Sequence, residues 1–237
     1  MAEIRRQKNV SDFRPSKRGY RFPNRFPGVP LPEQLTNALN IDPNDSVYGL
    51  CGGMCFTATD FFKAGREMPS LDDVPNRDHP LYQYISDRQK DSWGPLFSQV
   101  TRYITWMALS DAKAMKRTVK SINELKDNLD KGELTTLGLI YRDIRETLKV
   151  WDCHQVLAHG YSELEDGIIR VHVYDPNYAE KDDIHIELRP VDLDPDDEDN
   201  SRDGYAAAQY RKGELYKKMH GFFLVPYSYN EPPATLK

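Results

Sequence analysis

Of the 237 residues in the chain, 39% are hydrophobic, which is enough to form a sizeable core in one large domain. The formal net charge is −5, and the sequence holds neither an apolar run of 18 residues nor a secretory leader. We therefore expect no membrane span and no export, and a cytoplasmic location. Reduced thiols fit that location, because an odd number of cysteines cannot all pair: Cys51, Cys55 and Cys153.

The first 32 residues differ from the rest of the chain. They carry eight basic and two acidic residues, whereas the remainder is acidic overall. An acidic body lacks the broad basic face that nucleic-acid binding requires, so we do not expect a nucleic-acid partner. The same 32 residues hold five prolines and several aromatic residues without a helical or strand period, which predicts an irregular arm. Such an arm either packs across the surface or covers a cleft.

Helical spacing starts near Leu50. Apolar residues from Cys51 to Phe62 recur every three or four positions, and Gly65 follows where a C-terminal cap would stand. This pattern predicts one helix that opens at a cysteine. Three further helices are predicted over 78–90, 95–110 and 116–131.

The second half of the chain is rich in strand patterns. Glu165-Asp166-Gly167 supplies the turn of a hairpin, and strands are predicted over 134–141, 154–161, 168–174, 184–188 and 221–225. Strands joined by short turns pair antiparallel, and helices followed by such strands are typical of an α+β fold. We expect one domain with a mainly helical lobe and an antiparallel strand lobe behind the arm, over residues 33–132, 133–230 and 1–32 respectively.

The segment from Asp192 to Gly204 holds seven acidic residues and one basic residue. A solvated loop is the usual meaning of such a run. Acidic residues at 192, 194 and 196 alternate as calcium ligands would, but the glycine and glutamate of a helix-loop-helix calcium site are misplaced. We therefore do not predict a calcium site.

Cys51 is the candidate nucleophile. Gly52 and Gly53 leave the backbone beside the thiol bare, so a substrate carbonyl can approach and amide groups such as that of Gly52 can face an oxyanion. The start of a helix adds a positive potential that favours the thiolate. Cys55 lies one turn further into the helix and is expected to belong to the core.

Two histidines compete for the role of base. His154 and His159 would point to opposite faces of the strand over 154–161, so only one of them can face the thiol. His154 is preferred because its small and aliphatic neighbours let the strand pack under a cleft. Asp175 ends the next strand and can orient the imidazole, with Asn177 as the second candidate, although Asp-Pro-Asn is also an ordinary turn signal.

A zinc site built from the three cysteines and a histidine is the metal-binding alternative. Cys153 and His154 are adjacent on the predicted strand and would point to opposite faces, so they cannot easily share one tetrahedron. We therefore predict no metal and no cofactor.

Three segments together resemble papain-fold cysteine peptidases, particularly the bacterial double-glycine-peptidase-like branch: Cys51-Gly52-Gly53-Met54-Cys55-Phe56, His154-Gln155-Val156-Leu157-Ala158-His159-Gly160-Tyr161 and Asp175-Pro176. The resemblance implies Cys51 as nucleophile, His154 as base and Asp175 as the orienting residue, in a cleft between two lobes. The family commonly carries a glutamine shortly before the cysteine to complete the oxyanion hole. This stretch holds no glutamine here, and Asn44 is the donor that can replace it.

The ordered trio predicts a thiol-dependent hydrolase that cleaves a peptide or amide bond through a thioester on Cys51. One alternative is a non-catalytic peptide-binding or scaffold protein of the same fold with an incomplete oxyanion hole. The other is a thiol acyltransferase, which would use the same residues. A thiol far more than about 4 Å from the imidazole, with the arm filling the cleft, would favour the binding protein.

Overall fold

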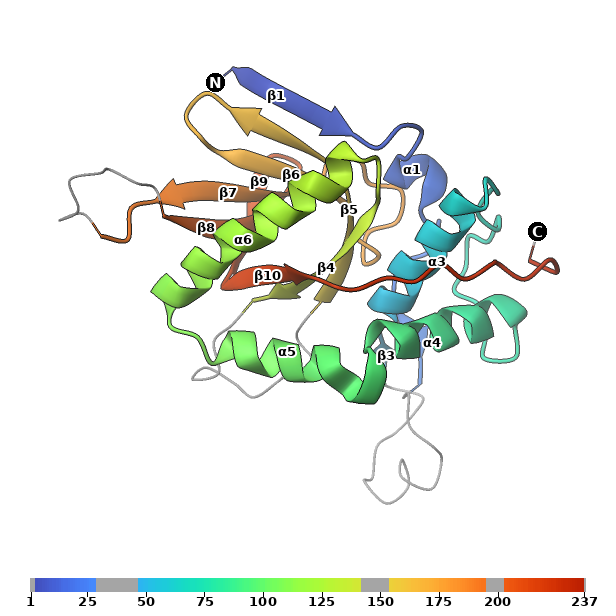
Figure 1. The fold of residues 1–237 in the computed structure, drawn as a ribbon. Coiled ribbons are helices and arrows are strands. Elements are labelled where there is room, and N and C mark those ends of the chain that lie inside the picture. Colours follow the sequence, from blue (N-terminus) through green and yellow to red (C-terminus); the bar gives the residue numbers. More distant parts are fainter. Residues whose placement is uncertain (1–2, 29–46, 142–153, 195–202, 237) are drawn as a thin grey trace.

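The computed structural model describes residues 3–28, 47–141, 154–194 and 203–236, and they form an α+β fold, the class predicted (Figure 1). The helices are α1 (Pro15–Arg18), α3 (Cys51–Lys63), α4 (Pro80–Ser92), the short 3₁₀ helix η1 (Pro95–Phe97), α5 (Ser98–Met107) and α6 (Asp111–Asp130). The strands are β1 (Ile4–Asn9), β2 (Phe26–Pro27), β3 (Val47–Tyr48), β4 (Thr135–Ile140), β5 (His154–Leu164), β6 (Ile169–Tyr174), β7 (His185–Val191), β8 (Gly204–Arg211), β9 (Glu214–Met219) and β10 (Gly221–Leu224).

Eight strands form one antiparallel sheet in the order β10-β4-β5-β6-β7-β8-β9, with β1 paired to β5, and β2 and β3 form a separate two-stranded sheet. The long strand β5 pairs with two strands along one of its sides: residues 154–158 pair with β4, and residues 160–164 pair with β1. Helix α6 packs against β8 and β10 and also contacts β1 and β5, while α3 packs against α4 and β5 (Figure 1). The sheet is curled, and its inner strand β5 contacts helix α3.

Helix α3 is buried on nearly all sides, from Gly52 to Phe61. Its glycines make this possible, because a Cβ atom on Gly53 would lie 2.1 Å from the backbone oxygen of Ile85 in α4. A Cβ atom on Gly52 would lie 2.1 Å from Oγ of Ser92. The sequence suggested that these glycines keep the backbone open for substrate, whereas the structure uses both for close packing against α4.

The N-terminal arm differs from the irregular segment expected. Its first part forms strand β1, and its four aromatic side chains are at most 3% exposed, in the hydrophobic core: Phe13, Tyr20, Phe22 and Phe26. Nearly all side chains of strand β1 are exposed, so its sequence shows no alternation of apolar and polar residues. Backbone pairing with β5, and not burial of side chains, keeps this strand in the sheet. The arm is a part of the domain.

The sequence did not predict β8 and β9, although they are joined by a recognisable turn. Lys212 and Gly213 both have positive φ, 52° and 77°, which is the geometry of a tight hairpin. These strands are short of β-branched residues, so their strand propensity is weak. In the acidic run, residues 195–202 lie outside the described part, and Asp203 accepts a hydrogen bond from the backbone of Leu193 at 2.9 Å.

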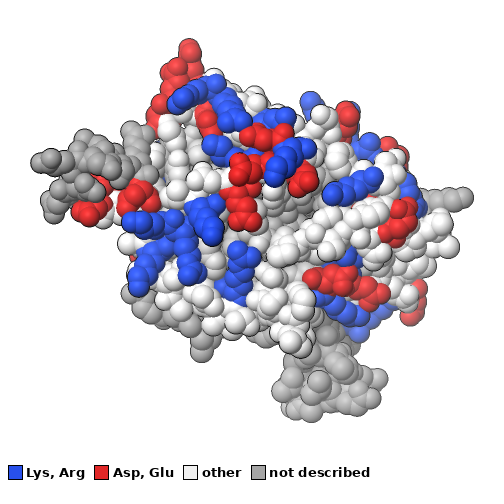
Figure 2. All heavy atoms as spheres, in the orientation of Figure 1, with Lys and Arg blue, Asp and Glu red and all other residues white. Residues whose placement is uncertain are grey.

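Figure 2 shows basic and acidic side chains interspersed on one face of the molecule, without a broad basic area on that face. Among the described helices, none is long and apolar enough to cross a membrane. The described residues also contain no group of three histidine, cysteine, aspartate or glutamate side chains that could hold a metal ion, and Cys153 lies outside them.

Asp60 is a fully buried carboxylate near the end of α3. Arg88 of α4 donates to it from Nε at 2.8 Å and from Nη2 at 3.1 Å, and the hydroxyls of Tyr84 and Tyr227 donate at 2.8 and 2.7 Å. The backbone N–H of Asn230 donates as well, at 3.1 Å. This cluster ties α3, α4 and the C-terminal segment together.

Replacing Asp60 by alanine should lower the free energy of unfolding by about 3–5 kcal/mol, because the buried Arg88 loses its main partner. Urea-induced unfolding followed by circular dichroism measures the loss. Asp87→Ala is the matched control, since the Asp87–Lys90 pair is exposed and its removal should cost about 0–1 kcal/mol. Equal losses in the two variants would contradict the role of the cluster.

Candidate active site

Cys51 is the first residue of α3, and its thiol is partly exposed. The preceding residue, Leu50, has non-helical backbone angles and no side-chain cap. Its backbone N–H donates instead to Oδ1 of Asn24 at 2.5 Å, so a residue of the N-terminal arm fixes the entry to the helix. Cys55 is fully buried one turn later and donates to the backbone oxygen of Gln155 at 3.7 Å.

His154 and Asp175 meet because their strands are neighbours. His154 opens β5, Asp175 directly follows β6, and the two strands pair antiparallel, so both residues lie at the same edge of the sheet. Nε2 of His154 lies 2.6 Å from Oδ1 of Asp175, and both side chains are buried. The other ring nitrogen, Nδ1, takes no part in this contact, and the imidazole lies near enough to Cys51 for the two groups to shift each other's pKa.

The carboxylate of Asp175 is held from two sides. The backbone N–H of Asn177 donates to Oδ1 at 3.0 Å, and Nε2 of Gln209 in β8 donates to Oδ2 at 2.7 Å. Nδ2 of Asn177 also lies 3.3 Å from Nε2 of His154. The two predicted orienting residues therefore stand together around the imidazole, and Asp175 makes the shorter contact.

The electrostatics of the site favour a charged thiol and a charged imidazole. Burial raises the pKa of Cys51, but the hydrogen bond and positive charge of His154, with amide contacts from Gln155 and Gly52, lower it below the ordinary thiol value overall. Burial lowers the pKa of His154, and the nearby charge of Asp175 outweighs that effect and raises it to about 10. Asp175 is held ionised in the same way, since His154 lowers its pKa against the effect of burial.

Cys55 has the opposite environment. Burial raises its pKa well above the ordinary thiol value, and the charges of Cys51 and Asp175 raise it further. A thiol in this environment stays protonated at neutral pH and is a poor nucleophile. The electrostatic contrast therefore distinguishes the two cysteines of α3.

The amide groups at the start of α3 have different partners. The N–H of Gly53 donates to Oε1 of Gln89 at 2.9 Å, and that of Gly52 faces the sulfur of Cys51. The backbone N–H of Cys51 has no hydrogen-bond partner among the described residues. It is thus the helix amide available to a group bound beside the thiol.

The three side chains open onto a pocket of about 320 Å³. Its wall combines aromatic rings with amide side chains and one lysine, from the arm, β3, β9 and the strand ends: Asn24, Val47, Tyr48, Gly49, Cys51, Tyr141, His154, Asp175, Asn177, Tyr216 and Lys217. Nζ of Lys217 lies 3.8 Å from the centre of the Tyr141 ring. The OH of Tyr141 donates to Oε1 of Gln209 at 2.8 Å, which extends the chain of contacts that begins at His154.

Sequence reasoning missed Asn24, Gln209 and Tyr141. Asn24 lies in an arm without a regular pattern, and Gln209 lies in a strand that was not predicted, so no local signal pointed to them. Asn44, the donor predicted from the sequence, lies outside the described residues. The other candidate base, His159, contacts Phe13 in a different pocket from that of Cys51.

No protein-family model, no curated protein and no solved structure matches the chain.

Iodoacetamide should alkylate Cys51 rapidly at about pH 6, well below the ordinary thiol pKa of about 8.5, because His154 favours the thiolate. In His154→Gln the pKa of Cys51 should rise, and the rate at this pH should fall about tenfold or more. Mass spectrometry of the labelled peptides measures both rates. Cys55 is the internal control, and labelling of Cys55 as fast as Cys51 would contradict the assignment of the activated thiol.

Proposed function

We propose that the chain is a thiol-dependent hydrolase of the papain-like type that cleaves a peptide or amide bond through a thioester on Cys51. The observation that carries this proposal is the buried His154–Asp175 contact of 2.6 Å, beside an open pocket whose wall also holds Cys51 at a helix N-terminus. Nucleophile, base and orienting residue in this order of contact are what acyl transfer from a carbonyl to sulfur requires. The function expected from the sequence is thus the one that the geometry supports best.

The reaction would proceed in two stages. The Cys51 thiolate attacks the carbonyl carbon, and the imidazolium of His154 gives its proton to the leaving amine as the carbon–nitrogen bond breaks, which leaves a thioester. Neutral His154 then takes a proton from water, the hydroxyl attacks the thioester, and the carbon–sulfur bond breaks to restore the thiolate. Asp175 keeps Nε2 of the ring engaged, so Nδ1 is the nitrogen that exchanges the proton.

We assign the oxyanion site to the backbone N–H of Cys51 and to Nδ2 of Asn24. The Cys51 amide has no partner among the described residues, and Asn24 lines the same pocket. Nδ2 of Asn24 has one hydrogen directed to Oδ1 of Asn177 at 3.1 Å, and an amide nitrogen carries a second. Asn24 would take the place of the glutamine that papain-like enzymes commonly carry before the cysteine.

The proposed substrate is a peptide or amide, with water as the second reactant and no metal or cofactor in the reaction. A thiolate nucleophile needs a reducing compartment, which agrees with the cytoplasmic location expected from the sequence. Lys217 is the one lysine or arginine in the pocket wall among the described residues.

The non-catalytic alternative receives less support from the site. It would be favoured by a thiol remote from the imidazole and by an arm that fills the pocket. Cys51 and His154 instead line the same pocket and shift each other's pKa, and the arm contributes Asn24 to the wall of a pocket that stays open. Acyl transfer to an amine would use the same residues, with the amine replacing water in the second stage.

Cys51→Ala should abolish turnover of a fluorogenic peptide library, and Asp175→Asn should lower kcat by about 10²–10⁴-fold, because the ring loses the charge that stabilises its protonated form. Cys55→Ala is the matched control and should keep most of the activity. Full turnover in Cys51→Ala would exclude the thioester route. Adding a primary amine at high concentration distinguishes acyl transfer, since only a transferase would give mainly the amide product.

Asn24→Asp tests the oxyanion assignment. The substitution keeps the acceptor oxygen that binds the Leu50 N–H and removes the donor, so kcat should fall by about 10²–10³-fold with little change in KM. The rate of iodoacetamide labelling of Cys51 at about pH 7 serves as the control, because alkylation builds no oxyanion. A variant with normal kcat would contradict the role of Asn24.

A further inference from the structure

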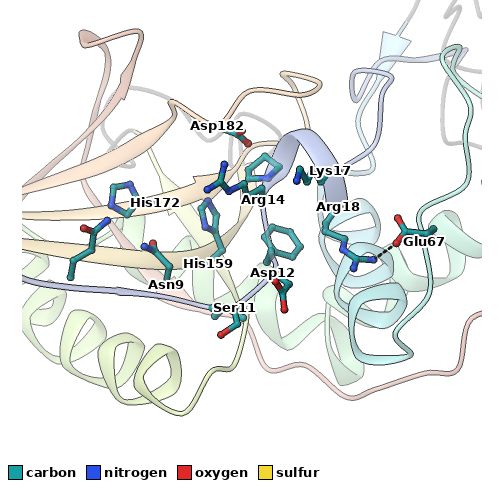
Figure 3. A pocket seen from close by; sticks show the side chains of 14 residues that line it. Asn9, Ser11, Asp12, Arg14, Lys17, Arg18, Glu67, His159, His172 and Asp182 are labelled. Carbon is teal, nitrogen blue, oxygen red and sulfur yellow. Dashed lines mark hydrogen bonds and ion pairs between the residues drawn. The ribbon is translucent and has the colours of Figure 1, made fainter.

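A second pocket, of about 830 Å³, lies between the N-terminal arm and strands β5 and β6 (Figure 3). It shares no lining residue with the pocket of Cys51. Its volume is in the range that holds organic ligands of the size of metabolites. The walls are strongly polar, with bases, acids, amides and two histidines.

His159 is the central feature of this pocket. The side chain is only 8% exposed, yet neither Nδ1 nor Nε2 has a hydrogen-bond partner. The residue stands at an irregularity in β5, between Ala158, which pairs with Val173, and Gly160, which pairs with His172. Such a bulge redirects a side chain, and bulges are common beside binding sites.

The ring of His159 lies between two other rings, 5.6 Å from Phe13 and 6.3 Å from His172. Burial and the neighbouring His172 lower its pKa to about 4, so the imidazole is neutral at pH 7. A neutral imidazole offers one N–H donor and one nitrogen acceptor. Buried polar atoms nearly always have partners, and both ring nitrogens are closed off from solvent, so a ligand that completes them has to displace a neighbouring side chain of the pocket wall.

Two cations of the pocket are also unmatched. Arg14 and Lys17 are exposed and have no ion-pair or side-chain hydrogen-bond partner among the described residues. The third base, Arg18, already pairs with Glu67 at 3.1 Å, as the dashed line in Figure 3 marks. Anionic oxygens are the ligands that guanidinium and ammonium groups bind.

The two aspartates of the pocket also differ in whether they have a hydrogen-bond partner. Asp182 already has partners, because its carboxylate accepts hydrogen bonds from the backbone N–H and the hydroxyl of Ser16, at 2.9 and 2.6 Å. Asp12 lines the pocket without such a partner among the described residues. An anion that also carries a hydroxyl or amino group would satisfy both Asp12 and the acceptor nitrogen of His159.

We propose that this pocket binds a small organic anion, whose carboxylate or phosphate group contacts Arg14 and Lys17 and whose hydroxyl or amino group contacts His159. The site is separate from Cys51, so the proposal does not depend on the hydrolase activity. The arm that completes the Cys51 pocket through Asn24 also forms this second site, through residues 7–18.

Titration of the full chain with O-phosphoethanolamine, which has a phosphate and an amino group but no carboxylate, and with citrate, which has carboxylates and a hydroxyl but no phosphate, tests the proposal and separates the two anionic groups. At least one of them should bind saturably in calorimetry, and the imidazole signals of His159 should shift in NMR spectra while those of His79 stay in place. The double variant Arg14→Gln, Lys17→Gln should weaken binding about tenfold or more. Both side chains are exposed, so the variant should keep its fold, which circular dichroism checks.

Arg25→Gln, Lys113→Gln is the matched control, because it removes the same two charges at exposed positions outside the pocket. Its affinity should equal that of the unmodified chain. The proposal is overturned if neither anion binds saturably, if both double variants lose affinity equally, or if binding leaves the signals of His159 unchanged. A tenfold loss confined to the first variant, with a selective shift of His159, supports it.

Discussion

The contact between His154 and Asp175 is the interaction on which the proposed chemistry depends. It exists because β5 begins and β6 ends at the same edge of the sheet, where the start of α3 brings Cys51 to the imidazole. Neither strand can shift by one residue without moving one partner to the opposite face. The register of two strands therefore fixes the nucleophile, the base and the orienting carboxylate together.

Burying a charged pair costs free energy unless other groups compensate for the lost water. Here Asp175 receives hydrogen bonds from Gln209 and from the backbone of Asn177, so both of its oxygens have partners besides the imidazole. Gln209 in turn accepts from Tyr141. The strand β8 thus supports a site to which it contributes no reacting group, because its Gln209 holds the carboxylate that raises the pKa of His154.

Much of the fold followed from the sequence, because α3 to α6 and the strands β4 to β7 and β10 have clear helical or alternating patterns. The residues Cys51, His154 and Asp175 were predicted from their order and faces, and they line one pocket in which His154 contacts Asp175. Asn24 and Gln209 escaped prediction for a physical reason: each reaches the site through tertiary pairing of a segment without local periodicity. Gly52 and Gly53 were recognised as important, but the reason is the close approach of α4 instead of access for substrate.

The pairing of β1 with β5 joins residues that lie about 150 positions apart, with Asn9 opposite Gly160. Contacts of such long range form late, because the intervening chain must first be ordered. During synthesis the arm leaves the ribosome long before β5, β6 and β8 have been made, and it can pack in its final position only after these strands are present. A nascent chain therefore carries its cysteine without the imidazole, carboxylate and glutamine that surround it later, and the thiol acquires its altered acidity only when nearly the whole polypeptide has been made.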